Sequence, residues 1–302
     1  MMKKKKMALG WSFLTIFFLV LALECSTTHV HGGRAPAFFD VTSYGAIADG
    51  KTDNTISMRF DFVTNSRVHH LRSINSKNSH FNLFACNNLN MSHIRISAPE
   101  GSPNTDGIHI GSSTNIRITR SIIGTGDDCI SMVSGSQDIH ISGVSCGPGH
   151  GISVGSLGKS PKEFVTGITV TNCTFRGTQN GVRIKTWAPS LASVASNFMF
   201  QNIFMDNVNN PIIIDQQYCP KPYCNDDDSK VEISNVTFRN IWGSSSSKVA
   251  VSLQCSGIVP CQNIKLANIN LSYNGPQGPP STSSCSNVRG QSFGRQIPSS
   301  CI

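Results

Sequence analysis

The chain has 302 residues, of which 38% are apolar and 14% are charged. This composition excludes a disordered chain and fits a globular protein with one large domain or two small ones. The formal charge of +8 points to a partner that carries acidic groups, either a nucleic acid or a polysaccharide built from uronic acids.

The first 31 residues have the pattern of an export signal. Four lysines at positions 3–6 precede an apolar run from Met7 to Leu23, and small and polar residues follow. We predict a secretory signal peptide rather than a membrane anchor, because the run only just reaches the about 20 apolar residues that a span requires. Without this segment the formal charge is about +5. We therefore expect a secreted, extracellular protein with no membrane contact.

A repeat occupies residues 57–302, after a strand and turn segment at 32–56. It consists of four apolar-leaning positions at offsets 0, 2, 5 and 7, which indicate a strand, a bend and a second strand. The copies start at Ile94 (partial), Ile116, Ile139, Ile168, Phe198, Val231 and Ile264. A further short strand starts 13 or 14 residues after most of these positions. No segment after the signal has a convincing helical period.

Short strands at this spacing are compatible with a sandwich, a propeller or a solenoid. A sandwich does not require the same offsets in every unit, whereas a solenoid does, because each coil lies on the previous one at about 4.8 Å. We therefore predict an all-β fold, a parallel β-helix. Inward positions become columns of Ile, Val, Phe and Cys, and outward positions become columns as well.

Four polar clusters between Ser102 and Trp187 each come directly before or within a short apolar strand: SPNTDGIHI, GTGDDCISM, GPGHGISVGSLG and NGVRIKTW. Stacking places five residues at one shared offset: Asp106, Asp128, His150, Asn180 and Asn210. Arg183 and Lys185 flank the inward-facing Ile184, so they are expected to point outward beside this column. The predicted result is a groove with carboxylates in its middle and cations at one end.

This column has the groups that glycoside hydrolysis needs. Carboxylates on neighbouring rungs cannot all ionise freely, so one is expected to keep its proton and serve as acid while another serves as base. Asp127 has two such neighbours, Asp106 and Asp128, which favour its protonated form. An isolated Asp-Asp pair is more often a turn feature. Catalysis is favoured only because these charged residues occupy equivalent offsets on adjacent coils.

The sequence predicts no cofactor and no metal site. It lacks a phosphate-binding loop and a nucleophile elbow. The acidic run Asp226–Asp228 lies outside the column, and we interpret it as a solvated loop, with a calcium site as the minor alternative.

Ten cysteines remain after the signal, and an even number in an exported chain favours disulfides. Short spacings suggest local bridges between Cys255 and Cys261, between Cys285 and Cys301, and in the segment Cys219–Cys224. Sequons for N-glycosylation occur at Asn90, Asn172, Asn235 and Asn270.

The motifs NTDGIHI, GTGDDCIS, GPGHGISVGSLG and RIKTW resemble those of the polygalacturonases of glycoside hydrolase family 28, especially plant ones, in the same order. The resemblance implies a right-handed parallel β-helix and hydrolysis of α-1,4-galacturonan with inversion. The implied partner is pectin, rather than a nucleic acid, and the implied state is a monomer. It also implies disulfides Cys129–Cys146, Cys255–Cys261 and Cys285–Cys301. The stretches NSKNSHFNLFAC and IIIDQQYCPKPYC are similar to the exo-acting pollen enzymes.

The resemblance assigns a role to seven residues. Asp127 matches the general acid, Asp106 and Asp128 match the carboxylates that position and activate water, and His150 matches the supporting histidine. Arg183 and Lys185 match the pair that binds the uronate, and loss of Lys185 is expected chiefly to weaken substrate binding. Tyr218 matches a tyrosine of the substrate site.

The sequence departs from the family pattern between Ile56 and Ser57. About three coils, roughly 90 residues at the repeat length of this chain, are expected there by the resemblance and do not occur. This motivates a second hypothesis, a shortened homologue that binds pectin without hydrolysing it.

Overall fold

The computed structural model describes residues 57–220, 228–276, 278 and 280–302, which all lie in one unit, Asp49–Ile302. The predicted signal peptide, the segment 32–56 and the residues Asp226, Asp227 and Cys224 lie outside the described residues. Their assignments stay predictions. Among the described residues, no helix is long and apolar enough to cross a membrane.

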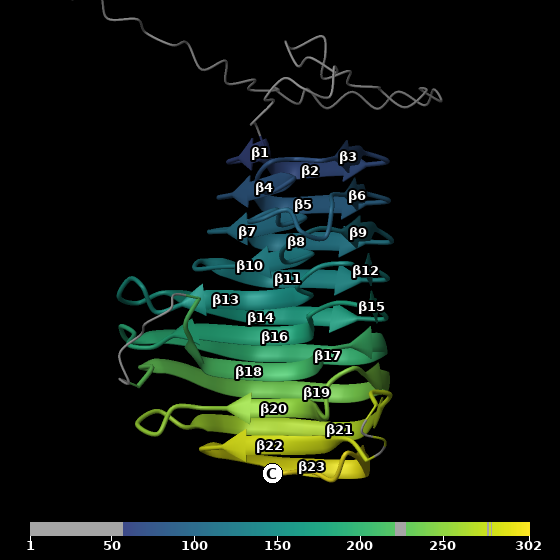
Figure 1. Cartoon of the computed structure of the whole chain (residues 1–302). Coiled ribbons are helices and arrows are strands. Elements are labelled where there is room, and N and C mark those ends of the chain that lie inside the picture. Colours follow the sequence, from purple (N-terminus) through teal and green to yellow (C-terminus); the bar gives the residue numbers. More distant parts are fainter. Residues whose placement is uncertain (1–56, 221–227, 277, 279) are drawn as a thin grey trace, which may run out of the picture. The chain divides into compact units, whose positions relative to one another are not determined.

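The described chain winds into a stack of coils, each of which contributes one strand to a nine-stranded sheet, sheet A (Figure 1). The strands of sheet A, in the order in which they pair, are β1 (Met58–Asp61), β4 (Phe81–Phe84), β7 (Ile108–Gly111), β10 (Ile130–Met132), β13 (Ile152–Leu157), β16 (Asn180–Trp187), β18 (Asn210–Tyr218), β20 (Val249–Gln254) and β22 (Thr282–Ser286).

The remaining strands form sheet B, which has two arms in the first five coils and long continuous strands in the last four. The first arm consists of β2 (Thr64–His69), β5 (Asn87–Ser92), β8 (Thr114–Thr119), β11 (Ser136–Ser142) and β14 (Phe164–Thr171). The second arm consists of β3 (Arg72–Ile74), β6 (Arg95–Ser97), β9 (Ile122–Gly124), β12 (Ser145–Cys146) and β15 (Thr174–Arg176). The long strands are β17 (Ser193–Val208), β19 (Val231–Ser245), β21 (Cys261–Tyr273) and β23 (Val288–Ile297).

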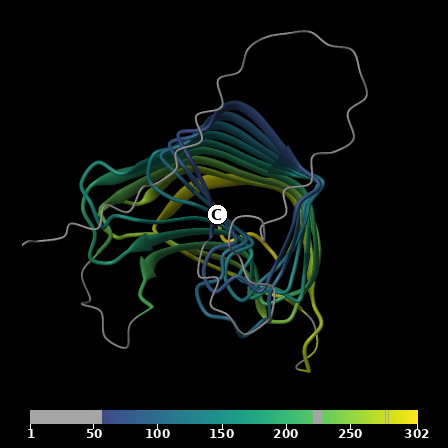
Figure 2. The same ribbon diagram turned by 90° about the horizontal axis from the view of Figure 1, so that it is seen from above.

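All pairings between coils are parallel and follow the predicted offsets. Ile130 of β10 is in register with Ile108 of β7 and with Ile152 of β13, and the same column continues to Val182 and Ile212. Viewed along the stack, strands of successive coils superimpose around a common interior (Figure 2). The prediction of an all-β parallel solenoid is therefore confirmed.

The interior consists of columns of apolar side chains, as the repeat predicts. The residues of the column that starts at Ile108 are 0–2% exposed. Aromatic residues also stack from coil to coil, because Phe200 of β17 and Phe238 of β19 are paired in register and their ring centroids lie 5.1 Å apart. Burial of these columns against their neighbours is the main source of stability in a solenoid.

The bend between the two arms of sheet B places one residue per coil in the left-handed region, where asparagine is favoured over other non-glycine residues. In later coils this position holds Asn172, Asn202, Asn240 and Asn268, with φ between 49° and 54°. Each of the last three donates a side-chain hydrogen bond to the asparagine of the preceding coil, at 3.0–3.3 Å. These asparagines form what we call the asparagine ladder.

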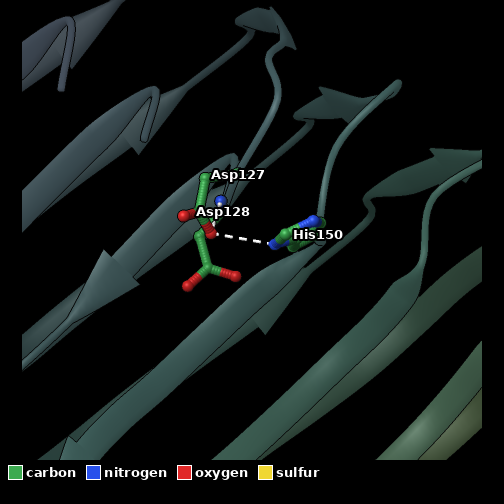
Figure 3. Close-up of side chains that lie close together, drawn as sticks. All are labelled: Asp127, Asp128 and His150. Atoms are coloured by element: carbon green, nitrogen blue, oxygen red, sulfur yellow. Dashed lines mark hydrogen bonds and ion pairs between the residues drawn. The ribbon is translucent and has the colours of Figure 1, made fainter. Parts of the chain in front are cut away.

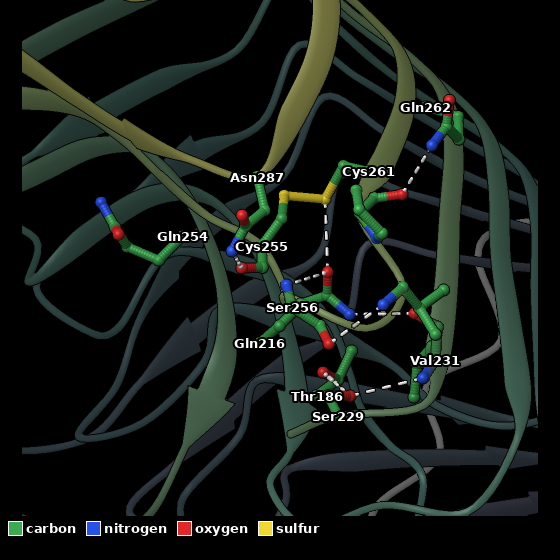
Figure 4. Close-up of a disulfide and its surroundings, with 12 residues drawn as sticks. Thr186, Gln216, Ser229, Val231, Gln254, Cys255, Ser256, Cys261, Gln262 and Asn287 are labelled. Carbon is green, nitrogen blue, oxygen red and sulfur yellow. Dashed lines mark hydrogen bonds between the residues drawn. A yellow bond between two sulfur atoms is a disulfide. The ribbon is translucent and has the colours of Figure 1, made fainter. Parts of the chain in front are cut away.

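Three disulfides are present among the described residues: Cys129–Cys146, Cys255–Cys261 and Cys285–Cys301. They match the pairings that the family resemblance implies. Below the Cys255–Cys261 bridge, the fully buried Gln216 accepts from the backbone of Ser256 and donates to the carbonyl of Val231 (Figure 4). Gln216 thus links two adjacent coils in the lower half of the stack. Cys86 and Cys173 are buried and reduced.

Candidate active site

An open cleft of about 410 Å³ lies over the outer face of sheet A. Its lining includes five of the seven predicted residues: Asp106, Asp127, Asp128, Lys185 and Tyr218. His150 borders the cleft through its contact with Asp127, and Arg183 through its contact with Asp128. All seven predicted residues therefore gather at one place.

Asp106 precedes β7 and is held by the strands beside it. Its Oδ2 accepts a hydrogen bond from Ser131 Oγ at 2.7 Å and lies 3.2 Å from His109 Nδ1. Its side chain is 15% exposed, and its Oδ1 has no hydrogen-bond partner among the described residues. One carboxylate oxygen of Asp106 is therefore available to a ligand in the cleft.

Asp127 and His150 form a pair across adjacent coils (Figure 3). The Oδ1 atom of Asp127 lies 2.9 Å from Nδ1 of His150 and also accepts a hydrogen bond from the backbone N–H of Asp128 at 2.8 Å. The glycine after His150 has φ +91°, and a Cβ there would collide with the carbonyl oxygens of Asn180 and Gly181. The histidine can therefore sit on this turn only with glycine beside it.

The charge state of Asp127 differs from the expectation that neighbouring acids keep it protonated. Burial raises the pKa of Asp127, but the hydrogen bond and charge of His150, together with Lys185 and the Asp128 amide, outweigh burial and leave that pKa below its usual value. Asp127 is thus predominantly ionised in the unliganded cleft.

Asp128 is a buried carboxylate with two cationic partners. It is 1% exposed, and its Oδ1 accepts from Arg183 Nη2 at 2.8 Å while its Oδ2 accepts from Lys185 Nζ at 2.9 Å. Ser153 Oγ donates to the same Oδ1 at 2.7 Å and accepts from Arg183 Nε at 3.0 Å. Arg183 and Lys185 point outward as expected. They do not stand as free cations at one end of the groove, because both close onto Asp128.

Tyr218 lies at the end of β18, beside the two cations. Its ring centroid is 5.2 Å from Lys185 Nζ and 6.0 Å from the guanidinium carbon of Arg183. Trp187 packs edge-on against the same ring at 5.2 Å. Tyr218 therefore extends the wall of the cleft beyond the carboxylates.

Three residues that shape the site were not singled out in the sequence: His109, Ser131 and Ser153. They occupy one outward column, because Ser131 is in register with both His109 and Ser153. The signal was present in IHI, ISM and ISV, where a polar residue stands between two inward apolar ones. A further acid, Asp215, is in register with Lys185; burial raises its pKa, and the N–H of Gln217 and the two cations oppose that rise.

Asp127, Asp128 and His150 offer ligand atoms within 4.8 Å of one another, which is close enough for a metal ion. Both oxygens of Asp128 already accept from positively charged donors. A divalent cation would have to displace Arg183 and Lys185 or lie against their charges, so this trio is poorly suited to hold a metal.

The model of glycosyl hydrolases family 28 matches residues 22–301 of the chain. An exopolygalacturonase from Platanus acerifolia is 49% identical over 245 residues, which make up 80% of this chain and 65% of that protein. The exopolygalacturonase clone GBGA483 from Arabidopsis thaliana is 48% identical over 82% of this chain and 56% of that protein. The chain thus spans between about half and two thirds of the length of these two relatives.

The fold has a close counterpart among solved structures. The endo-xylogalacturonan hydrolase from Aspergillus tubingensis superposes with a TM-score of 0.67 and 24% sequence identity, over 80% of this chain and 68% of that chain. At this level of identity the likeness concerns the fold alone.

Proposed function

Because the chain belongs to glycoside hydrolase family 28, we propose that it hydrolyses the α-1,4-galacturonosyl linkages of polygalacturonan with inversion at the anomeric carbon. The observation that carries the proposal is the joint placement of Asp106, Asp127 and Asp128 on one cleft, each with different partners. One carboxylate is paired with a histidine, one is neutralised by two cations, and one keeps a free oxygen. Different environments are what separate the acid and base roles of carboxyl groups.

We assign the acid role to Asp127. Its largest single influence is burial, which raises its pKa, and a polysaccharide that covers the cleft increases this influence. A substrate carboxylate beside Lys185 also offsets the positive charge that lowers the pKa of Asp127. Both effects favour the form of the Asp127–His150 pair in which Asp127 carries the proton. Asp127 then protonates the glycosidic oxygen while the bond from that oxygen to the anomeric carbon breaks.

We assign the base role to Asp106, because its Oδ1 is available. Water attacks the anomeric carbon from the face opposite the leaving group, and its proton passes to Asp106. Ser131 and His109 hold the other oxygen of Asp106 and fix the direction of the free one. Asp128 flanks the attacking water and, through Arg183 and Lys185, places positive charge where a uronate carboxylate is to bind.

The test compares wild-type protein with the Asp127→Asn variant on polygalacturonate between about pH 4 and 6, with new reducing ends as the readout. Asparagine keeps the size and the hydrogen-bond reach of the side chain but cannot deliver a proton. We expect turnover to fall at least about 1,000-fold, with polymer binding retained. A variant with more than a tenth of wild-type turnover contradicts the assignment of Asp127. Wild-type protein that is folded and binds polymer without releasing reducing ends favours the shortened, non-hydrolytic homologue.

We further propose that the enzyme is exo-acting, secreted to the cell wall and monomeric. The two relatives described above are named exopolygalacturonases, and the three disulfides suit an oxidising compartment. Product sizing tests the first point, because an exo-acting enzyme releases small products from the start and an endo-acting enzyme releases a ladder of oligomers.

A further inference from the structure

Five cationic or histidine side chains gather on sheet B, on coils next to one another and away from the strands that line the cleft. We call this set the basic face: His70, Arg72, His93, Arg95 and Arg120. All five are exposed. Figure 1 shows the strands concerned, β2, β3, β5, β6, β8 and β9, in the first coils of the described chain.

The basic face lies on coils that precede the asparagine ladder. His70, His93 and Arg120 occupy in their coils the bend position that asparagines occupy in later coils, with φ of 56°, 54° and 47°. This backbone conformation suits asparagine better than arginine, whereas histidine also adopts it more often than most residues do. These three positions therefore gain no ladder hydrogen bonds, and Arg120 holds a backbone conformation that is uncommon for arginine.

The charges of the basic face also repel one another. Arg72 and Arg95 are directly opposite on the paired strands β3 and β6, an arrangement that is destabilising for like charges. The rings of His70 and His93 stack with their centroids 4.7 Å apart. Desolvation lowers the pKa of His93, and His70, Arg120 and His69 lower it further. Among the residues that the structure describes, no acidic side chain forms an ion pair with any of the five.

We propose that the basic face binds a polyanion, namely a segment of the acidic polysaccharide outside the cleft, and so holds the protein on its polymer between catalytic events. A ligand with one carboxylate per sugar offers regularly repeated negative charges to cations that repeat from coil to coil at about 4.8 Å. Such a ligand would relieve a repulsion that no acidic side chain relieves within the described part of the chain. The choice of polysaccharide rests on the proposed function; the anionic character of the ligand does not.

The test uses the double variant Arg95→Gln/Arg120→Asn. Asparagine at position 120 restores the residue that the ladder carries in later coils, so the variant is expected to fold at least as well as wild type. The matched control is Arg239→Gln/Lys265→Gln, which removes the same charge from exposed positions of β19 and β21 on sheet B. Neither control residue has an ion-pair partner among the described residues.

Two measurements separate the basic face from the cleft. The first is retention on cross-linked polygalacturonate as NaCl is raised, where we expect the variant to elute at clearly lower salt and its affinity to fall about tenfold or more at low salt. The second is turnover of a short galacturonate oligomer, which is expected to be unchanged. Retention equal to wild type, or an equal loss in the control, overturns the proposal.

Two further outcomes are distinguishable. If the wild type fails to hydrolyse the oligomer, the proposed function fails, but the retention experiment still reports on the basic face. Tighter binding of the wild type to vesicles of phosphatidylserine than to polygalacturonate, lost in the variant, contradicts the polysaccharide as ligand.

Discussion

Asp128 shows how one residue can change the expected role of its neighbours. By resemblance, Arg183 and Lys185 match a substrate-binding pair. On that interpretation, loss of Lys185 would chiefly raise KM. In the structure both cations neutralise a carboxylate that is 1% exposed. Removing Lys185 leaves Oδ2 of this buried carboxylate without its donor, which is costly in a way that a lost surface contact is not.

We therefore predict that Lys185→Met lowers kcat as well as raising KM, and lowers the free energy of unfolding by about 1–3 kcal/mol. Steady-state kinetics and denaturant unfolding measure both effects, with the exposed Lys265→Met as control. An increase in KM alone, with kcat and the free energy of unfolding unchanged, would show that the ion pair between Lys185 and Asp128 contributes to neither turnover nor stability.

His80 is a second residue whose surroundings determine its chemistry. It is 1% exposed, its ring Nδ1 pairs with Ser73 Oγ at 2.8 Å, and its Nε2 is buried without a partner. Burial lowers the pKa of His80 to about 4. The unfolded chain, with a pKa of 6.5 for this group, then binds more protons than the folded chain between these values.

It follows that the stability contributed by neutral His80 is present above about pH 6.5 and is lost as the pH falls toward 4. The full difference amounts to about 3 kcal/mol. His80→Gln, which stays neutral, should flatten the pH dependence of the unfolding free energy in this window. The unfolding free energies of the wild type and the His80→Gln variant are compared at pH 7 and pH 4.5. If both proteins lose the same stability between these pH values, groups other than His80 cause the acid sensitivity.

At the scale of the element, the bends between strands restrict the type of residue more strictly than the strands do. The strands are short and similar in sequence, whereas each bend needs a residue that accepts the left-handed conformation. The asparagine ladder satisfies this need and adds hydrogen bonds along the stack. The bends thus set the length and register of each coil.

Asn202 provides a test of this interpretation. It has φ 54°, donates to Asn172 and accepts from Asn240. Asn202→Ala should lower the free energy of unfolding by about 1–3 kcal/mol, through backbone strain and two lost hydrogen bonds. Asn202→Gly relieves the strain but not the loss of hydrogen bonds, so its cost should be smaller. If the glycine variant is no more stable than the alanine variant, backbone strain at this bend is unimportant.

At the scale of the whole molecule, two different sides of the stack carry the two groups of charged residues. The outer face of sheet A carries the cleft, and the first coils of sheet B carry the basic face. Since each coil contributes to both sheets, one coil can carry a carboxylate of the cleft on one side and a cation of the basic face on the other. Asp106, for example, precedes β7, and Arg120 directly follows β8, the next strand along the chain, in the same coil.

The histidines of the basic face predict that polymer binding depends on pH. His93 faces His69, His70 and Arg120, and its pKa lies below the usual 6.5, so it gains its proton only in mildly acidic solution. The salt concentration that elutes wild type from polygalacturonate should rise between pH 7 and pH 5. For the His70→Asn/His93→Asn variant the rise should be smaller, so that the gap between the proteins widens as pH falls. A constant gap would show that these histidines do not contribute charge to binding.

The sequence by itself determined the architecture and the location of the site. The repeat at offsets 0, 2, 5 and 7 was sufficient because parallel stacking converts equal offsets into columns, which is why Asp106, Asp128 and His150 could be placed on neighbouring coils in advance. The family was identified by the resemblance of the four motifs, and the match of the family model to residues 22–301 confirms it.

Only the tertiary structure decided how the charges are paired. Arg183 and Lys185 lie two coils from Asp128, 55 and 57 residues away in the sequence, and side chains of this length can turn toward substrate or toward a carboxylate with equal backbone positions. The pKa of Asp127 depends in part on that choice, because the charge of Lys185 is one of the influences that lower it, after those of His150. Burial and pairing depend on three-dimensional distances of a few ångströms, which the order of residues along a strand does not fix.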